Sequence, residues 1–138
     1  MLLLNRKLEP LKVHLQNLQQ QLLRKLQQFR STIKAQGITT IINNRPDGED
    51  GHPSSHSQLQ SAAEALGLKY YFIPFVGMNF PPQTVAQMAA VLEHSSGKVL
   101  AFCRTGNRSI NAWAKANEAA NTGLDTVKLV ASTSFKLV

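Results

Sequence analysis

The run Lys98-Val99-Leu100-Ala101-Phe102-Cys103-Arg104-Thr105-Gly106-Asn107-Arg108-Ser109 decides how the rest of the chain is interpreted. Residues 98–102 are mostly apolar and predict a strand, and residues 110–119 predict a helix. A strand, a short loop and a helix place Cys103 at the carboxyl end of the strand, where the backbone N–H groups of the loop face it. Such a cradle for an anion favours the thiolate, which is the nucleophilic form of cysteine.

The side chains beside Cys103 strengthen this interpretation. A lone cysteine at the end of a strand is most often a small buried apolar residue. Here Arg104 and Arg108 offer planar donors for an oxyanion, and Gly106 lets the backbone curl around one. Ser109 can hydrogen-bond the sulfur or cap the following helix. We therefore expect Cys103 and Arg108 to be catalytic, and the following residues to bind the anion: Arg104, Thr105, Gly106, Asn107 and Ser109.

Strand and helix patterns alternate along the chain from residue 37. We expect strands over 38–42, 68–74 and 98–102, helices over 57–66, 81–94 and 110–119, and either an edge strand or a helical turn over 126–131. This alternation predicts an α/β fold with a parallel or mixed central sheet flanked by helices. Right-handed crossovers would bring the loops 43–51, 75–80 and 103–108 to one edge of the sheet, where such folds bind ligands.

The N-terminal segment, residues 1–36, differs from the α/β domain that we assign to residues 37–138. It holds seven basic residues and one acidic residue, so it carries most of the net charge of +7. Its apolar residues recur at helical spacing and predict a basic amphipathic helix packed on the domain. Self-association into a homo-oligomer and attachment to an anionic membrane surface are the alternatives. The apolar positions are Leu8, Leu11, Leu15, Leu18, Leu22, Leu26, Phe29 and Ile33.

The composition narrows the functional classes. A chain of 138 residues is one domain by size, and its single cysteine excludes an internal disulfide and a cysteine cluster for a metal. The basic segment has one aromatic residue, Phe29, so we expect no nucleic-acid binding. His52 and His56 lack the pattern of a metal site, and nothing implies a cofactor. Without a secretory leader or a membrane-spanning length, we expect a cytoplasmic protein.

Two patterns together resemble a known family. The loop Cys-Arg-x-Gly-x-Arg-Ser resembles the active loop of rhodanese-type sulfurtransferases. The wider pattern is similar to the beta-lactamase-hydrolase-like family and its phosphatase-like domain, over about residues 34–120. This resemblance implies a fold like that of dual-specificity phosphatases, and an activity labelled phosphatase or sulfur transfer. The segments that carry it are 41–49, 67–68, 73–74 and 99–109.

Several positions depart from the cysteine phosphatases. Those enzymes carry five residues between the cysteine and the arginine, whereas four separate Cys103 from Arg108. They usually have histidine before the cysteine, where this chain has Phe102, and an aspartic acid in the loop that corresponds to residues 75–80, which holds no carboxylate. Asp47 is our candidate for the missing general acid, with plain turn chemistry as its alternative. Glu49 or Asp50 could substitute, and Arg45 in the same loop is a candidate for anion binding.

Three functions follow, and the short loop and the missing acid set their order. The first is a sulfurtransferase in which Cys103 takes sulfur from a sulfane-sulfur donor and passes the persulfide sulfur to a thiol acceptor. The second is a phosphatase that hydrolyses a phosphate ester through a Cys103 phosphoenzyme. The third is a non-catalytic module that senses an anion or the redox state.

Overall fold

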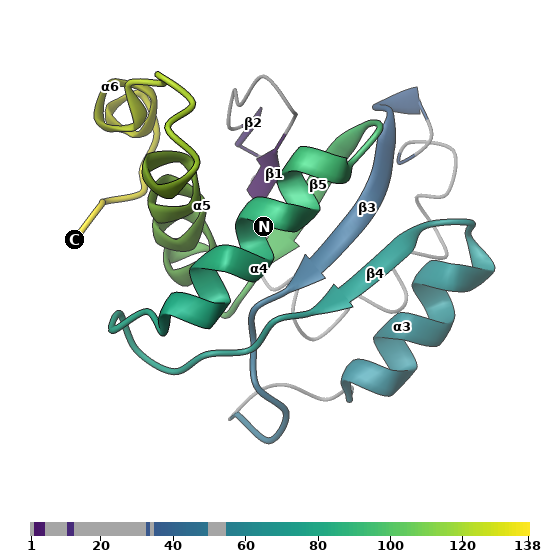
Figure 1. Ribbon diagram of the computed structural model, residues 1–138. Coiled ribbons are helices and arrows are strands. Elements are labelled where there is room, and N and C mark those ends of the chain that lie inside the picture. Colours follow the sequence, from purple (N-terminus) through teal and green to yellow (C-terminus); the bar gives the residue numbers. More distant parts are fainter. Residues whose placement is uncertain (1, 5–10, 13–32, 34, 50–54) are drawn as a thin grey trace.

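A five-stranded mixed sheet forms the centre of the protein, whose computed structural model describes residues 2–4, 11–12, 33, 35–49 and 55–138. Strand β3 (Ile38–Asn43) lies between β4 (Lys69–Phe72) and β5 (Lys98–Phe102) and runs parallel to both. Strands β1 (Leu2–Leu4) and β2 (Leu11–Lys12) extend the β5 side with antiparallel pairing. The order β2-β1-β5-β3-β4 confirms the predicted α/β architecture with a mixed sheet (Figure 1).

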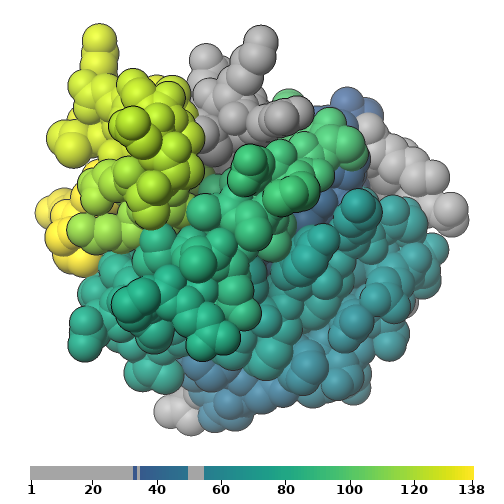
Figure 2. Space-filling view, viewed as in Figure 1, coloured from purple at the N-terminus to yellow at the C-terminus, as the bar shows by residue number. Residues whose placement is uncertain are grey.

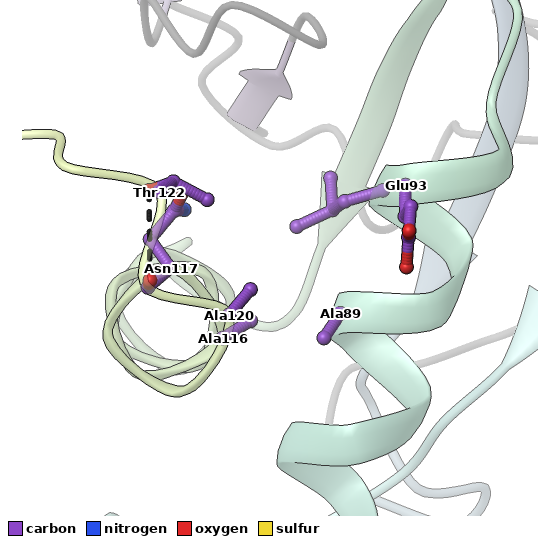
Figure 3. A pocket seen from close by; sticks show the side chains of 7 residues that line it. Ala89, Glu93, Ala116, Asn117, Ala120 and Thr122 are labelled. Atoms are coloured by element: carbon purple, nitrogen blue, oxygen red, sulfur yellow. Dashed lines mark hydrogen bonds between the residues drawn. The ribbon is translucent and has the colours of Figure 1, made fainter.

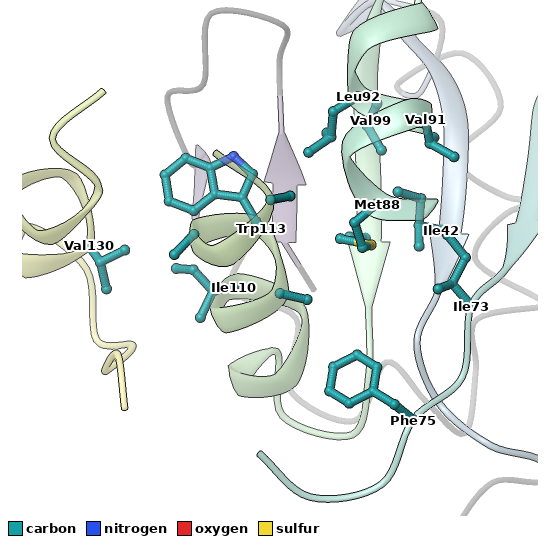
Figure 4. Close-up of a cluster of buried hydrophobic side chains, with 14 residues drawn as sticks. Ile42, Ile73, Phe75, Met88, Val91, Leu92, Val99, Ile110, Trp113 and Val130 are labelled. Carbon is teal, nitrogen blue, oxygen red and sulfur yellow. The ribbon is translucent and has the colours of Figure 1, made fainter. Parts of the chain in front are cut away.

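Helices cover both faces of the sheet. Helix α3 (His56–Ala65) lies beside β4, whereas α4 (Pro82–His94) and α5 (Asn107–Ala119) pack together on the opposite face (Figure 1). Because side chains alternate along a strand, β3 and β5 each supply both cores. The α3 core includes Ile41, Leu59, Leu100 and Phe102. The larger core, on the α4 and α5 side, includes Ile42, Met88, Val99, Ala101, Ile110 and Trp113 (Figure 4).

Local sequence signals fix most helix ends. Ser55 and Gln58 form a capping box at the start of α3. The helix therefore begins at His56, one residue before its predicted start at residue 57. Pro82 begins α4 as predicted, because proline suits the first helical position. Helix α5 begins at Asn107, three residues before its predicted start. Residues 126–131, left open between strand and helix, form α6 (Thr126–Ala131).

The N-terminal segment is described only in part. Leu11 and Lys12, which the apolar stripe assigns to a helix, form a strand instead, because backbone pairing with β1 outweighs a local helical pattern. Ile33 and Ala35 are helical. Residues 13–32, which hold most of the apolar stripe, lie outside the described residues. The self-association and membrane-surface alternatives depend on that stripe and stay predictions. Among the described helices, none has the length and apolarity needed to cross a membrane.

Candidate active site

Cys103 follows the last residue of β5 and is buried, with 3% of its surface exposed. The loop between the strand and α5 is short, because α5 begins at Asn107. Gly106 sits at the helix N-cap in the left-handed region, with φ of 93°, a conformation that glycine adopts without strain. This conformation aims the Gly106 N–H at the cysteine, and the nitrogen lies 3.1 Å from Sγ. One backbone donor of the predicted cradle therefore contacts the sulfur, and the full anion cradle stays a prediction.

Arg108, in the first turn of α5, connects the cysteine loop to two other loops. Its Nη1 and Nη2 donate to the two carboxylate oxygens of Glu49 at 2.8 and 2.7 Å. Nη1 also donates to the carbonyl oxygen of Phe75 at 3.0 Å. Glu49 lies in the loop after β3, and Phe75 lies in the loop after β4. The three loops expected at one edge of the sheet thus meet at Arg108.

The charges of this cluster are coupled. Burial of the guanidinium lowers the pKa of Arg108, but its hydrogen bond with Glu49 and the charge of Cys103 together raise it by more, so the net shift is upward. The hydrogen bond from Arg108 lowers the pKa of Glu49 against the opposing effect of burial. Both groups are therefore charged at neutral pH. Glu49 and the Phe75 carbonyl together fix the orientation of the guanidinium.

Arg45 is the second arginine that contacts Glu49. Its side chain is fully buried, and Nε donates to Oε1 of Glu49 at 3.0 Å. Its backbone N–H donates to the side chain of Asn43 at 2.8 Å, which fixes the first turn of the loop. The expectation that Arg45 binds a substrate anion stays a prediction. In this structure the contacts of its guanidinium include Glu49, which in turn holds Arg108.

A hydrogen bond between Asn44 and Ser109 connects the loop after β3 to the first turn of α5. The Ser109 hydroxyl was predicted to reach the sulfur or cap the helix, but it donates to Oδ1 of Asn44 at 2.8 Å. The Asn44 side chain donates to the Ile73 carbonyl at 2.9 Å, and its backbone N–H donates to the Phe102 carbonyl at 2.9 Å. Both Asn44 and Ser109 are fully buried. The Ser109 hydroxyl consequently connects two loops, and its role in anion binding stays a prediction.

Asp47 lies at a turn in the loop that follows β3. Its Oδ1 accepts a hydrogen bond from the backbone N–H of His56 at 2.8 Å, and its Oδ2 lies 3.8 Å from Nε2 of the same residue. These contacts fasten the loop to the first turn of α3. The role of Asp47 as a general acid stays a prediction, and its turn-forming alternative has these contacts in its favour.

The remaining predicted anion-binding residues in the loop are less buried than Cys103. Arg104 and Thr105 are exposed, and Asn107 is half-buried. The Thr105 hydroxyl accepts from the Asn107 N–H at 3.3 Å. The Arg104 side chain is thus accessible, and the anion-binding role of all three residues stays a prediction.

Sequence reasoning missed Glu49 as the partner of Arg108 and Asn44 as the partner of Ser109. Glu49 was considered only as a substitute acid. A signal was present: two asparagines directly follow the predicted strand 38–42, and acidic residues follow within the same loop. Across the described residues, no group of three or more His, Cys, Asp or Glu side chains is placed to hold a metal ion.

A separate hollow lies between α4 and α5, away from the cysteine loop. Its lining includes Ala89 and Glu93 from α4 and Ala116 and Asn117 from α5 (Figure 3). The Thr122 hydroxyl donates to Asn117 at 2.9 Å and closes one side of it. None of the predicted site residues lines this hollow.

The fold and the buried cysteine define an α/β domain with its candidate site at one edge of the sheet. The family described as "Beta-lactamase hydrolase-like protein, phosphatase-like domain" matches residues 27–124, and the chain belongs to this family. The resemblance expected from the sequence is thereby confirmed.

Curated relatives agree with this assignment. The chain is 34% identical over 82 residues to a beta-lactamase hydrolase-like protein of Agrobacterium fabrum, covering 59% of this chain and 19% of the relative. It is 32% identical over 78 residues to a protein of the same name from Xylella fastidiosa strain Temecula1, covering 56% of this chain and 18% of the relative. The chain thus spans about a fifth of the length of these relatives.

Solved structures share the fold. A candidate phosphatase from Neisseria meningitidis Z2491 matches with a TM-score of 0.62 and 24% identity, over 79% of this chain and 73% of that one. A candidate phosphatase from Shewanella putrefaciens CN-32 matches with a TM-score of 0.61 and 21% identity, over 82% and 73% of the two chains. At these identities the likeness concerns the fold.

Proposed function

We propose that this domain is a cysteine-dependent phosphatase that hydrolyses small phosphomonoesters through a phosphoenzyme on Cys103. The observation that carries the proposal is the place of Arg108: it lies in the first turn of the helix that follows the Cys103 loop, where Glu49 holds its guanidinium by two hydrogen bonds. A fixed guanidinium beside a nucleophile stabilises the charge that develops on phosphoryl oxygens in the transition state. The phosphatase-like family and fold support this order, which reverses the one expected from the sequence.

The reaction has two steps. The Cys103 thiolate attacks the phosphorus atom, a phosphorus–sulfur bond forms, and the ester phosphorus–oxygen bond breaks to release an alkoxide or phenoxide. Water then attacks the phosphocysteine, releasing inorganic phosphate and restoring the thiolate. The loop over residues 75–80 supplies no carboxylate to protonate the leaving oxygen. We therefore expect aryl phosphates, whose leaving groups are stable as anions, to react much faster than alkyl phosphates.

Sulfur transfer is the second candidate, and the length of the loop favours it. Three residues separate Cys103 from the first residue of α5, so the cradle is small for a tetrahedral phosphoryl group. In this reaction the thiolate attacks the outer sulfur of thiosulfate, the sulfur–sulfur bond breaks, and sulfite leaves. The persulfide on Cys103 passes its outer sulfur to cyanide or an external thiol. Neither step needs a general acid, and no second cysteine can discharge the persulfide internally.

Two assays on the same preparations separate the candidates. Purified wild type and Cys103→Ser are each given p-nitrophenyl phosphate, with phosphate release measured. The same proteins are incubated with thiosulfate and weighed by intact-mass spectrometry before and after cyanide. Phosphate release that requires Cys103 supports the phosphatase. A cyanide-labile gain of one sulfur atom without phosphate release would support the sulfurtransferase instead. If wild type shows neither activity, the third, non-catalytic hypothesis is the one that stands.

The same assays test Asp47. If Asp47 is the general acid, Asp47→Asn slows an alkyl phosphate about 10²-fold and leaves an aryl phosphate nearly unchanged, because only the poor leaving group needs a proton. An equal effect on both esters would assign Asp47 to holding α3 through His56.

A further inference from the structure

The C-terminal residues pack against the back of the cysteine loop. Two ring carbons of Phe135 lie 2.6 and 2.9 Å from the point that a Cβ atom on Gly106 would occupy. The ring therefore fills the space beside the Gly106 Cα. In the space-filling view this end of the chain, in yellow, lies at the surface beside α5 (Figure 2). Gly106 is the residue whose N–H donates to the Cys103 sulfur, so Phe135 packs against a backbone position that contacts the sulfur directly.

Asn111 ties the same segment to the first turn of α5. Its Nδ2 donates to the Lys136 carbonyl at 2.9 Å and to the Asn107 carbonyl at 2.8 Å. Its Oδ1 accepts from the Val138 N–H at 2.8 Å. Asn111 is 2% exposed, so these bonds are shielded from water. One buried amide thus links the C-terminal segment to the turn that also carries Arg108.

The approach to Phe135 is fixed as well. The Thr133 hydroxyl donates to the Val130 carbonyl at 2.7 Å, and it accepts from the Phe135 N–H at 3.1 Å. Phe135 and Leu137 are half-buried against the larger core. The segment is therefore held at both sides of Phe135. The family match ends at residue 124, so this support comes from outside the matched region.

We propose that Phe135 is a positioning residue for the cysteine loop: its ring confines Gly106 to the left-handed conformation that directs the N–H at the Cys103 sulfur. Glycine has more backbone freedom than any other residue, so its orientation depends on what packs against it. The inference rests on the proposed function in taking Cys103 as the nucleophile. It does not depend on which group Cys103 transfers.

Alkylation of Cys103 by iodoacetamide tests this proposal without a substrate. The rate is measured from about pH 5 to 10 for wild type, Phe135→Ala and Leu137→Ala. Leu137→Ala is the matched control, because Leu137 packs on the same core from the same segment. Loss of one donor to a charged sulfur predicts that the Phe135→Ala profile moves to higher pH. Its rate at low pH should fall about tenfold, while the Leu137→Ala profile stays in place.

A conservative variant separates loss of the contact with Gly106 from loss of the fold. Phe135→Leu keeps an apolar contact with Gly106, and its profile should lie between those of wild type and Phe135→Ala. Identical profiles for wild type, Phe135→Ala and Phe135→Leu would overturn the proposal. Equal shifts in Phe135→Ala and Leu137→Ala would overturn it too, because they would mean general loosening of the core. If wild type turns over neither p-nitrophenyl phosphate nor thiosulfate, the proposed function fails while the alkylation comparison is unaffected.

Discussion

Replacing Glu49 with glutamine keeps the shape of the side chain and removes its charge. In the folded protein Glu49 accepts three hydrogen bonds from charged donors: two from Arg108 at 2.7 and 2.8 Å and one from Arg45 at 3.0 Å. Glutamine keeps a single acceptor oxygen, and its NH₂ group would face a guanidinium. The variant therefore leaves a fully buried arginine and the proposed catalytic arginine without their shared counter-charge.

The size of the loss follows from these contacts. A hydrogen bond to a charged group contributes about 1.5–3 kcal/mol, and glutamine retains part of the set. The Glu49 side chain is 26% exposed, so water compensates for some of what is lost. We expect Glu49→Gln to lower the free energy of unfolding by about 2 kcal/mol at pH 7. A displaced Arg108 should also lower kcat/KM about 10²-fold, since a shift of about 1 Å in a positioning group has that effect.

The pH dependence gives the sharper assay. The hydrogen bond from Arg108 lowers the pKa of Glu49 below its ordinary value of 4.5, against the effect of burial. A carboxylate with a lowered pKa in the folded state stabilises the protein fully above the unfolded value, and this stabilisation is lost as the pH falls through the folded value. Urea unfolding should therefore show the full difference between wild type and Glu49→Gln at pH 7. The difference should shrink as the pH falls below 4.5.

Glu64→Gln provides the control, because the Glu64 carboxylate lies on the exposed face of α3 and accepts from Gln60 alone among the described bonds. It should change the unfolding free energy by less than about 0.5 kcal/mol. The reasoning is refuted if Glu49→Gln matches this control at pH 7, or if its deficit is the same at pH 7 and about pH 3.

Three further predictions concern the surroundings of the site. Ser109→Ala leaves the buried Asn44 oxygen without its 2.8 Å donor and should cost about 1–3 kcal/mol in urea unfolding; an unchanged midpoint would contradict this contribution of the hydrogen bond. Gly106→Ala should lower the free energy of unfolding by about 1–2 kcal/mol from its φ of 93° alone, and a clash with Phe135 should lower it further. A double-mutant cycle with Phe135→Ala should show coupling between the two positions, and additive effects would argue against their contact. Burial raises the pKa of Tyr70 to about 12, so ultraviolet titration of Tyr70→Phe should lack a phenolate step near pH 12; a step lost near pH 10 instead would contradict this.

The cysteine loop could be predicted because all its parts are local. A strand, a glycine and a helix within residues 98–119 specify the backbone, and the residue types between them indicate an anion site. The α/β class followed in the same way from alternating patterns, and the meeting of three loops followed from the handedness of the crossovers. The two N-terminal strands could not be predicted, because a short edge strand depends on a distant partner: β1 pairs with β5, almost a hundred residues later.

The sequence by itself therefore determined the class of fold, and it indicated Cys103 and Arg108, the residues that we propose as the nucleophile and its arginine. The tertiary structure decided their partners: that Glu49 meets Arg108 while Asp47, two residues earlier, turns to His56, and that Phe135 packs on Gly106. Gly48, with φ of 82°, lies between the two acidic residues, whose carboxylates contact different partners. Local patterns reflect the preferences of neighbouring residues, whereas contacts between distant residues depend on how the whole core packs.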